Sequence, residues 1–278
     1  MTTRWYSEED LKVSFDVFEQ FAKRNNFDIH KKYENGTFLY YLTRKCIPVH
    51  FISGADQVEF KFMDIADLHI GHPLFDENAL RKKLSEAVKN GYTIVFIAGD
   101  LFEGACNKLD KMQFNDQIKL ASSIFKDYPL TYYAINGNHD YSFEQIGLSN
   151  PIECLASKLQ QEGIEFYYFD TYVMDFIICG VVKRVMHVER QDFNKKKIFA
   201  SLKIKMFDEE NMLMVHYNEE DYPVRFFQVG HIHVNVQMFY AKKKIYISQS
   251  GSFLMNEKVE DRANFIQGKV IDQKVFLS

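Results

Sequence analysis

Residues 93–100 read TIVFIAGD, an apolar run that stops at Gly99-Asp100. Apolar runs of this length that end at a polar, glycine-containing turn are typical of buried strands. An open α/β sheet places its functional residues just beyond the carboxyl ends of such strands. The stretch therefore predicts an α/β fold with Asp100 in a functional site at the edge of a buried sheet.

Four further segments share this design, in which polar residues follow an apolar run. They are Asp67-Leu68-His69 after residues 60–66, Gly137-Asn138-His139-Asp140 after 130–135, His216 after 212–215, and Gly230-His231-Ile232-His233 after 226–229. Because strand ends meet at one edge of a sheet, we expect all five segments to converge. Their carboxylate, amide and imidazole groups suit two divalent ions about 3.5 to 4 Å apart, which can hold a phosphoryl group and activate water. Asp100, central in the order, is the expected bridge between the two ions.

The ordered series D-x-H, G-D, G-N-H-D, H and G-H-x-H resembles the signature of the calcineurin-like metallophosphoesterase superfamily over roughly residues 59–278. The resemblance implies an αββα sandwich, in which two mixed sheets pack face to face and helices flank both. It also implies two ligand sets, namely Asp67, His69, Asp100 and His233 for one metal, and Asp100, Asn138, His216 and His231 for the second. His139 resembles the family's non-ligand histidine, which faces the substrate and assists the leaving group.

Several polar residues near these motifs have less defined roles. His72 lies in the loop after the first motif, where it is either a substrate contact alongside Asn138 and His139 or a solvated residue. Asp64 interrupts an apolar run, and we expect it to be hydrogen-bonded to neighbouring groups and not to bind metal. No motif surrounds His30, His50 or His187, and the sequence assigns them no role.

The reaction that this resemblance favours is hydrolysis of phosphodiester bonds by a metal-bridging hydroxide, on nucleic acid or nucleotides. We expect two divalent ions, with Mn favoured and Fe, Zn or Ni as alternatives, because sites of nitrogen and oxygen ligands accept each of these metals. Residues 61–71 and 99–102 are locally similar to the SbcD-type double-strand-break-repair nucleases. Those nucleases commonly carry histidine or aspartate directly after G-D-x-F, where this chain has Glu103.

Two other functions stay open, a phosphomonoesterase for a small metabolite and a non-catalytic scaffold of the kind found in a retromer subunit. A monoester is a dianion, and its enzymes commonly add arginines that bind the extra oxygens. The nearest arginines along the chain are Arg81, Arg184 and Arg225, on elements expected to lie away from the strand ends. The absence of an arginine beside the motifs therefore favours a diester.

The chain has 278 residues, of which 46% are hydrophobic, enough for one large α/β domain and a small appendage. We expect the main domain to span residues 59–278 and a helix followed by a β-meander to occupy residues 1–58. Ser7 is the expected N-cap of that helix, and Asn35-Gly36 is the expected two-residue hairpin turn. The N-terminal module either docks on a sheet edge or recognises a substrate or partner.

The expected helices of the main domain span residues 77–89, 111–126, 151–161 and 190–205, and the expected strands near the C-terminus span 234–240, 244–248, 263–269 and 270–277. Residues 183–205 form a basic run, with eight lysines and arginines against Glu189 and Asp192. Such a run is either a solvated face or a track for a polyanion, and Lys195-Lys196-Lys197 would be its centre.

The remaining composition bears on location and partners. The four cysteines, Cys46, Cys106, Cys154 and Cys179, are widely spaced, a usage typical of a reducing, cytoplasmic compartment. No apolar run approaches the roughly 18 residues that a membrane span needs, so we expect no membrane contact. A formal net charge of −4 gives no general indication of nucleic-acid binding. The sequence does not determine the oligomeric state.

Overall fold

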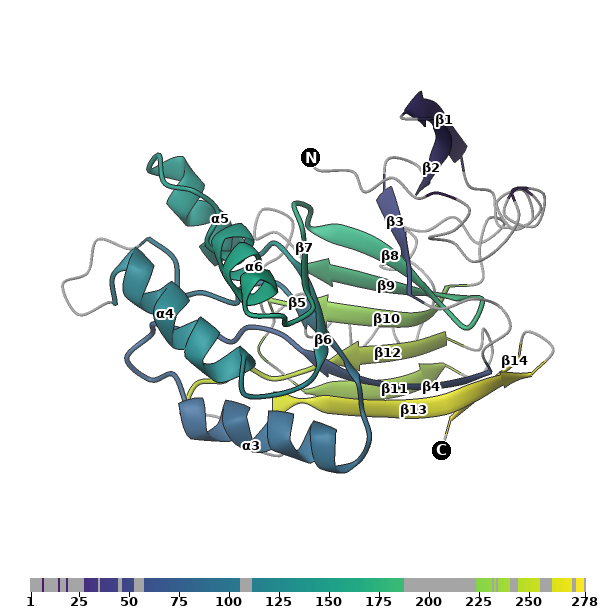
Figure 1. Ribbon diagram of the computed structural model, residues 1–278. Coiled ribbons are helices and arrows are strands. Elements are labelled where there is room, and N and C mark those ends of the chain that lie inside the picture. The colour runs from purple at the N-terminus through teal and green to yellow at the C-terminus, as the bar shows by residue number, and fades with distance from the viewer. Residues whose placement is uncertain are drawn as a thin grey trace.

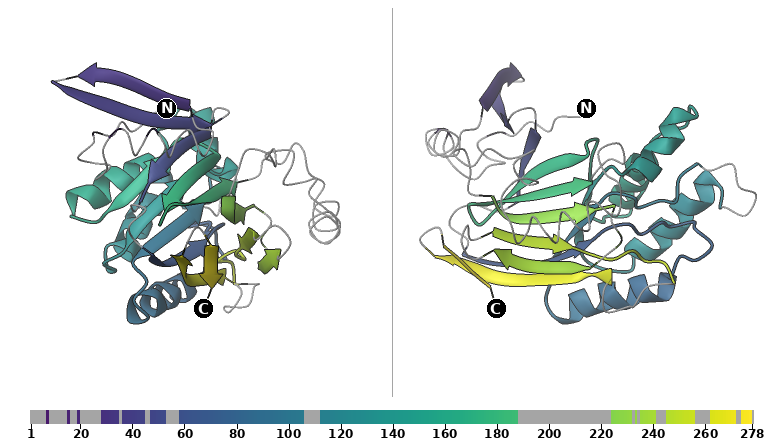
Figure 2. Two further views of the ribbon diagram at one scale, coloured as in Figure 1. Left: turned by 90° about the vertical axis from the view of Figure 1, so that its right-hand side faces the viewer. Right: turned by 180° about the vertical axis from the view of Figure 1, so that it is seen from behind.

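The computed structural model describes residues 7, 15, 19, 28–34, 36–44, 47–52, 58–105, 112–187, 224–231, 233, 235–240, 245–255, 262–271 and 274–277. Within them, two mixed β-sheets pack face to face, and helices lie against the outer face of one sheet (Figure 1). The views from the side and from behind show the same layers (Figure 2). The αββα class expected from the sequence is confirmed in its two mixed sheets and flanking helices.

The first sheet has six strands in the order β14-β13-β4-β5-β6-β7. Its strands are β4 (Glu59–Ile65), β5 (Ile94–Ala98), β6 (Thr131–Ile135), β7 (Phe166–Phe169), β13 (Asn264–Ile271) and β14 (Lys274–Leu277). Strands β4 to β7 are parallel, whereas β13 pairs antiparallel with β4. The helices of this half are α3 (Glu77–Lys89), α4 (Phe114–Phe125), α5 (Asn138–Gln145) and α6 (Pro151–Gln161). The parallel arrangement brings the carboxyl ends of β4, β5 and β6 to one edge.

The second sheet has eight strands in the order β1-β2-β3-β8-β9-β10-β12-β11. They are β1 (Asp28–Glu34), β2 (Thr37–Arg44), β3 (Ile47–Phe51), β8 (Val173–Ile178), β9 (Val181–His187), β10 (Val224–Gly230), β11 (Val236–Tyr240) and β12 (Ile245–Gln249). Strands β9 and β10 are parallel neighbours, and β10 is also parallel to β12. The carboxyl ends of β9 and β10 therefore lie together, next to those of the first sheet.

The core follows the two-residue period of the strands. In β4, Met63 and Ile65 face the helices, whereas Phe62 faces the second sheet. In β5, Val95 faces the helices and Phe96 faces the second sheet in the same way. Both faces of these strands are buried, which explains why they read as nearly continuous apolar runs in the sequence.

Most of the expected elements are confirmed where the structure describes them. Residues 77–89 and 151–161 form α3 and α6, and the expected helix at 111–126 is the shorter α4. The expected strand break after Lys269 is wrong, because β13 continues to Ile271. The expected helix at 190–205 and the strand at 212–215 lie outside the described residues.

The N-terminal hairpin extends the second sheet. Strands β1 and β2 pair antiparallel with Glu34 opposite Thr37, which confirms the expected hairpin, and β3 pairs parallel with β8. The buried ring of His50, on β3, lies 5.0 Å from the ring of Phe169 and 5.2 Å from that of Tyr133, both on the first sheet. Within the described residues, β3 therefore extends the second sheet, and His50 packs between the two sheets.

Two neighbouring residues of β9, Lys183 and Arg184, each form a buried ion pair with an aspartate. Lys183 Nζ on β9 donates to both oxygens of Asp64 on β4, at 2.8 and 2.9 Å, and Arg184 binds Asp175 of β8. All four side chains are fully buried. The expectation that Lys183 and Arg184 belong to a basic surface is therefore wrong, because buried aspartates neutralise them. The rest of the basic run lies outside the described residues.

Among the described residues, no helix is both long enough and apolar enough to cross a membrane.

Candidate metal centre

The motif residues lie just beyond strand ends, at the edge where the two sheets meet. Asp67 and Asp100 follow β4 and β5, Asn138 follows β6, and His231 follows β10. Five residues of this edge have positive φ angles although none is glycine, namely Asp67, His69, Asp100, His231 and His233. Such a backbone costs of order 1 to 3 kcal/mol per residue and is concentrated at functional sites. The strain therefore marks this edge as the functional centre.

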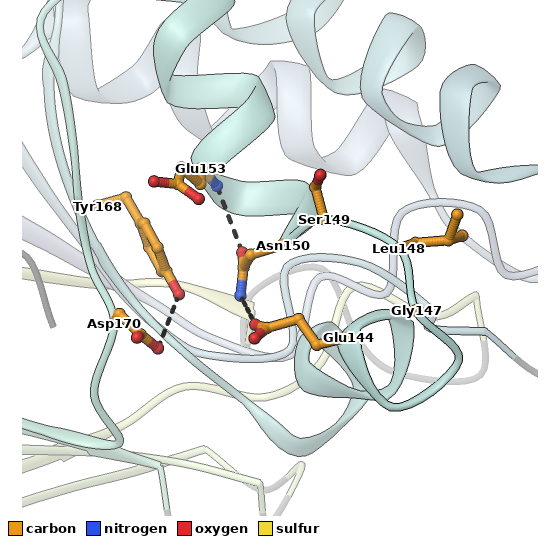
Figure 3. A pocket seen from close by; sticks show the side chains of 8 residues that line it. All are labelled: Glu144, Gly147, Leu148, Ser149, Asn150, Glu153, Tyr168 and Asp170. Atoms are coloured by element: carbon orange, nitrogen blue, oxygen red, sulfur yellow. Dashed lines mark hydrogen bonds between the residues drawn. The ribbon is translucent and has the colours of Figure 1, made fainter.

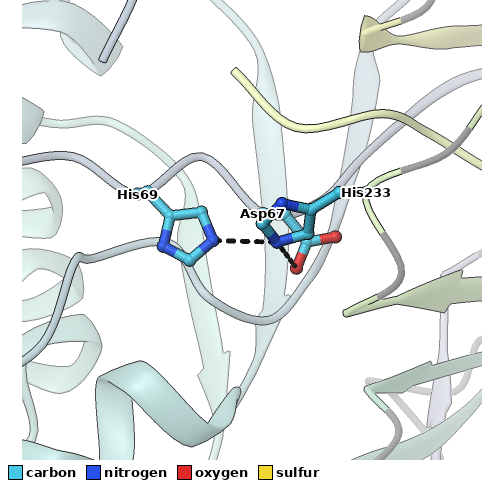
Figure 4. Close-up of side chains that lie close together, drawn as sticks. All are labelled: Asp67, His69 and His233. Carbon is cyan, nitrogen blue, oxygen red and sulfur yellow. Dashed lines mark hydrogen bonds and ion pairs between the residues drawn. The ribbon is translucent and has the colours of Figure 1, made fainter. Parts of the chain in front are cut away.

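The first group of ligands consists of Asp67, His69 and His233 (Figure 4). The Nε2 atoms of His69 and His233 are 3.1 Å apart, and His233 Nε2 is 3.6 Å from Asp67 Oδ1. On its other side, the His69 ring places Nδ1 3.0 Å from Glu103 Oε2. Two imidazole nitrogens and a carboxylate thus converge on one point, as a metal ion requires.

The second group consists of Asp100, His187 and His231, with Asn138 beside them. His187 Nε2 lies 3.1 Å from Asn138 Oδ1 and 3.4 Å from Asp100 Oδ2. Its Nδ1 lies 2.8 Å from the carbonyl oxygen of Ala98 and donates to it. A metal-binding histidine usually donates the N–H of its second ring nitrogen to a carbonyl or carboxylate oxygen. The hydrogen bond of His187 to Ala98 is of this kind.

His187 is a candidate ligand to which the sequence assigns no role. It is the last residue of β9, so it lies at a strand end, as the described motif segments do. Because Lys183 and Arg184 lie in the middle of that strand, its sequence is typical of a charged surface segment. The sequence does not show that each cation has a fully buried partner, which is Asp64 for Lys183 and Asp175 for Arg184. His216, which the sequence assigns to this position, lies outside the described residues.

Asp100 contacts residues of two neighbouring segments of the centre. Its Oδ1 accepts the backbone N–H of His139 at 2.8 Å, while Oδ2 faces His187. A Cβ atom at Gly137 would lie 2.2 Å from Asp100 Oδ1 and from its backbone nitrogen, so only glycine allows the two loops to approach this closely. Asp140 holds them together, because its carboxylate accepts the N–H groups of Leu101, Phe102 and Gly137.

His139 lies beside the first group without belonging to it. Its ring packs edge-to-face on His69 with centroids 4.7 Å apart, and its Nδ1 donates to the carbonyl oxygen of Glu103 at 2.7 Å. His72 is half-buried in the loop after His69, where its Nδ1 accepts the backbone N–H of Leu74 at 3.0 Å. The structure therefore brings His139 to the centre, whereas His72 is engaged in its own turn.

A family comparison agrees with this arrangement. The family model described as calcineurin-like phosphoesterase matches residues 60–235, more than half of the chain. The chain belongs to the calcineurin-like phosphoesterase family. Among solved structures, it is similar to a dimetal phosphatase from Danio rerio, with 12% identity, a TM-score of 0.45, and coverage of 78% of this chain and 94% of that chain. As a member of the family, this protein is a metal-dependent phosphoesterase.

The candidate centre brings several buried ionisable side chains together, and the pKa values of Asp67 and Asp100 shift in opposite directions. Burial raises the pKa of Asp67 to about 7, with the negative charge of Asp100 adding to the effect. Burial would also raise the pKa of Asp100, but the charge and hydrogen bond of His187 hold it well below its usual range. In the metal-free site, the surroundings therefore favour the ionised form of Asp100 more than that of Asp67.

The pKa values of two histidines in the centre are both raised. Burial would lower the pKa of His187, but the charge and hydrogen bond of Asp100 raise it to about 9. The pKa of His69 is also raised, because the hydrogen bond of Glu103 and the charge of Asp100 outweigh burial. The pKa of both histidines is thus raised in the metal-free site, so a metal ion that binds them would compete with protons.

The donor set fits the dinuclear centre that the family binds. Each group offers ligand atoms within 4.8 Å of one another, and the two groups are linked by the partly buried contact between His231 N–H and both oxygens of Asp67 at 2.9 Å. Buried carboxylates that face several histidines are costly unless they bind cations. The described residues can therefore hold two divalent ions, one in each group.

Proposed function

We propose that this protein is a dimetal phosphodiesterase. The observation that supports a diester is that two metal-ligand groups meet at Asp100, while each arginine side chain that the structure describes is bound to a carboxylate elsewhere. A phosphodiester carries one negative charge, which two ions can balance without further cations, whereas a monoester dianion favours additional arginine contacts.

The three described arginine side chains have defined partners. Arg81 on α3 donates to Glu77 at 2.7 Å and to Asp127 at 2.7 Å. Arg184 is buried against Asp175, and Arg262 Nη1 donates to Asp76 at 2.6 Å. Each ion pair stabilises a structural element, so none of the three guanidinium groups is placed to bind the extra oxygens of a monoester.

The first ion of the proposed centre would be held by Asp67, His69, Asp100 and His233. The second would be held by Asp100, Asn138 and His231 with one further histidine, which is either His187, beside them in the described geometry, or the His216 of the sequence pattern. Two bound ions would hold the phosphoryl group, stabilise charge on its oxygens and lower the pKa of a bound water. We propose Mn²⁺ as the native ion, because the mixed carboxylate, amide and imidazole set suits it.

His139 is the proposed general acid. Its Nδ1 is fixed on the Glu103 carbonyl, which leaves Nε2 to deliver a proton to the leaving-group oxygen. Asn138 supplies its amide oxygen from the preceding position, and both residues begin α5, so one turn orients them together. We also propose that His72 contacts the substrate from the loop beyond His69.

A pocket next to α5 bears on which diesters fit. It has a volume of about 480 Å³, and its lining includes three acidic residues, Glu144, Glu153 and Asp170 (Figure 3). A phosphate backbone would be repelled from this side. The nucleic-acid part of the proposal therefore depends on the local likeness to repair nucleases and on Lys195-Lys196-Lys197, which lie outside the described residues.

The experiment compares two model substrates with Mn²⁺ present. We expect kcat/KM for bis-p-nitrophenyl phosphate to exceed that for p-nitrophenyl phosphate by at least about tenfold, near 1.4 kcal/mol in transition-state binding. The reverse preference would contradict the diesterase proposal and support the phosphomonoesterase. Replacing Lys195, Lys196 and Lys197 with alanine then tests nucleic acid, because only turnover of single-stranded DNA at low salt should fall.

We propose a reducing compartment such as the cytoplasm for this enzyme. Cys154 and Cys179 are free thiols, in keeping with the wide spacing of the four cysteines along the chain.

A further inference from the structure

Glu103 lies between a proposed metal ligand and the proposed general acid. It is 4% exposed, and its Oε2 is 3.0 Å from His69 Nδ1. On the opposite side of the His69 ring, Nε2 faces His233 at 3.1 Å in the first ligand group. The ring therefore points one nitrogen at Glu103 and the other at the expected metal.

The main chain of the same residue contacts the other histidine. The carbonyl oxygen of Glu103 accepts from His139 Nδ1 at 2.7 Å, and its N–H donates to the carbonyl of Ile70 at 3.0 Å. The next residue, Gly104, has φ of +88°, and a Cβ atom there would lie 2.8 Å from the carbonyl oxygen of His139. The backbone after Glu103 thus lies directly against the first turn of α5, which carries His139.

We propose that Glu103 is a positioning residue that sets the proton positions of both histidines. Its carboxylate keeps the proton of His69 on Nδ1, so that the Nε2 lone pair faces the first metal. Its carbonyl keeps a proton on His139 Nδ1, so that Nε2 faces the leaving group. The acceptor opposite one ring nitrogen decides which nitrogen is available to a metal or substrate. This inference rests on the proposed function, because it assigns Glu103 a role at that site.

A different role for Glu103 is direct metal binding. Ligand atoms of His69, Glu103 and His139 lie within 4.8 Å of one another, as a metal site would require. The contact of Glu103 Oε2 with His69 Nδ1 favours positioning, because this oxygen is already used on the side of the ring away from His233. Variants that separate the acceptor oxygen from the negative charge distinguish the two roles.

The test uses Glu103→Leu, which removes the acceptor, and Glu103→Gln, which keeps an acceptor oxygen without the charge. Glu144→Leu is the matched control, because Glu144 accepts from Asn150 Nδ2 at 2.7 Å in the acidic pocket (Figure 3). Each metal-free protein is titrated with Mn²⁺ alone. We expect Glu103→Leu to bind two ions with the affinity for one lowered about 10- to 100-fold, the usual loss for an outer-shell partner. Glu103→Gln and Glu144→Leu should stay near the wild type.

A spectroscopic readout follows the proton itself. In Zn²⁺-loaded protein labelled with ¹⁵N-histidine, the His69 Nδ1–H proton should be visible in the wild type and in Glu103→Gln, because its hydrogen bond protects it from exchange. It should be lost from Glu103→Leu, whereas the His139 Nδ1–H signal should persist, because the main-chain carbonyl remains.

Three results would overturn the proposal. Unchanged Mn²⁺ affinity in Glu103→Leu would remove the positioning role, and loss of a whole ion in both Glu103 variants would make Glu103 a ligand. A wild-type His69 with its proton on Nε2 would contradict the proposal even if Glu103→Leu failed to fold. None of these measurements uses turnover, so a wild type that binds two ions and hydrolyses no diester would contradict only the proposed function.

Discussion

The two ligand groups of the metal centre share one sheet edge but differ in how their residues reach it. The first group, Asp67, His69 and His233, is composed wholly of residues that the sequence motifs name. The second group combines Asp100 and His231 with His187, which no motif names. The difference shows that the end of a strand can be predicted from the local sequence, whereas the strand that pairs with it cannot be predicted in this way. The position of His187 depends on β9 pairing with β10.

The sharpest test of this difference is a pair of variants, His187→Ala and His216→Ala. The described geometry predicts that His187→Ala retains one ion of two and loses turnover, because Asp100 and Asn138 lose their imidazole partner. If His187 is the ligand that completes the second group, His216→Ala retains both ions. Metal analysis of the purified variants measures the outcome. The converse result would assign the second group to His216, as the sequence pattern has it, and give His187 a structural role.

A smaller loss is expected from His139→Asn, which leaves both groups intact. If His139 only protonates the leaving group, this variant keeps two ions and lowers kcat by roughly 10² to 10⁴, the usual worth of a positioned general acid. The measurement combines metal content with steady-state kinetics. Loss of an ion would show instead that His139 supports the first group through its contact with His69.

The buried pair of Lys183 and Asp64 connects the strand before the first group to the strand that carries His187. Lys183→Met should lower the free energy of unfolding by about 3 to 5 kcal/mol, because Asp64 would remain buried and unpaired. Chemical denaturation measures this loss. The double variant Lys183→Met with Asp64→Leu is the control and should recover most of the stability. Equal loss in both variants would mean that packing, and not the uncompensated charge, is responsible.

The smallest effect is expected at Asp76, which supports the loop of the first group. Asp76 caps α3 by accepting from Ala79 N–H, and it also binds Arg262. Burial would raise its pKa, but these two contacts lower it. A lowered pKa stabilises the fold above the ordinary value of about 3.9, and this stabilisation is lost as the pH falls through the folded value.

Asp76→Ala should therefore cost about 1 kcal/mol at pH 7, and the gap to the wild type should close below about pH 4. Denaturation at several pH values measures it. Asp76→Asn is the matched control, because asparagine also caps helices but does not titrate. A gap between Asp76→Ala and the wild type that stays constant down to pH 2 would contradict the role of the carboxylate charge.

Much of this structure can be read from the chain because its signals are local. The apolar run before Asp100 predicts β5, and the Asn35-Gly36 turn predicts the hairpin of β1 and β2. What could not be read depends on partners distant in sequence. Lys183 appears solvated until Asp64, 119 residues away, is placed beside it. The role of Glu103 likewise needs the contact with His69 across 34 residues.

The central claim is that Asp100 joins two metal ions in one centre, and metal content tests it most directly. Wild-type protein reconstituted with Mn²⁺ should hold two ions per chain, measured by elemental analysis after removal of free metal. Asp100→Asn should hold well under one ion and show no turnover, because both groups lose their shared carboxylate. Two ions still bound to Asp100→Asn would contradict the account.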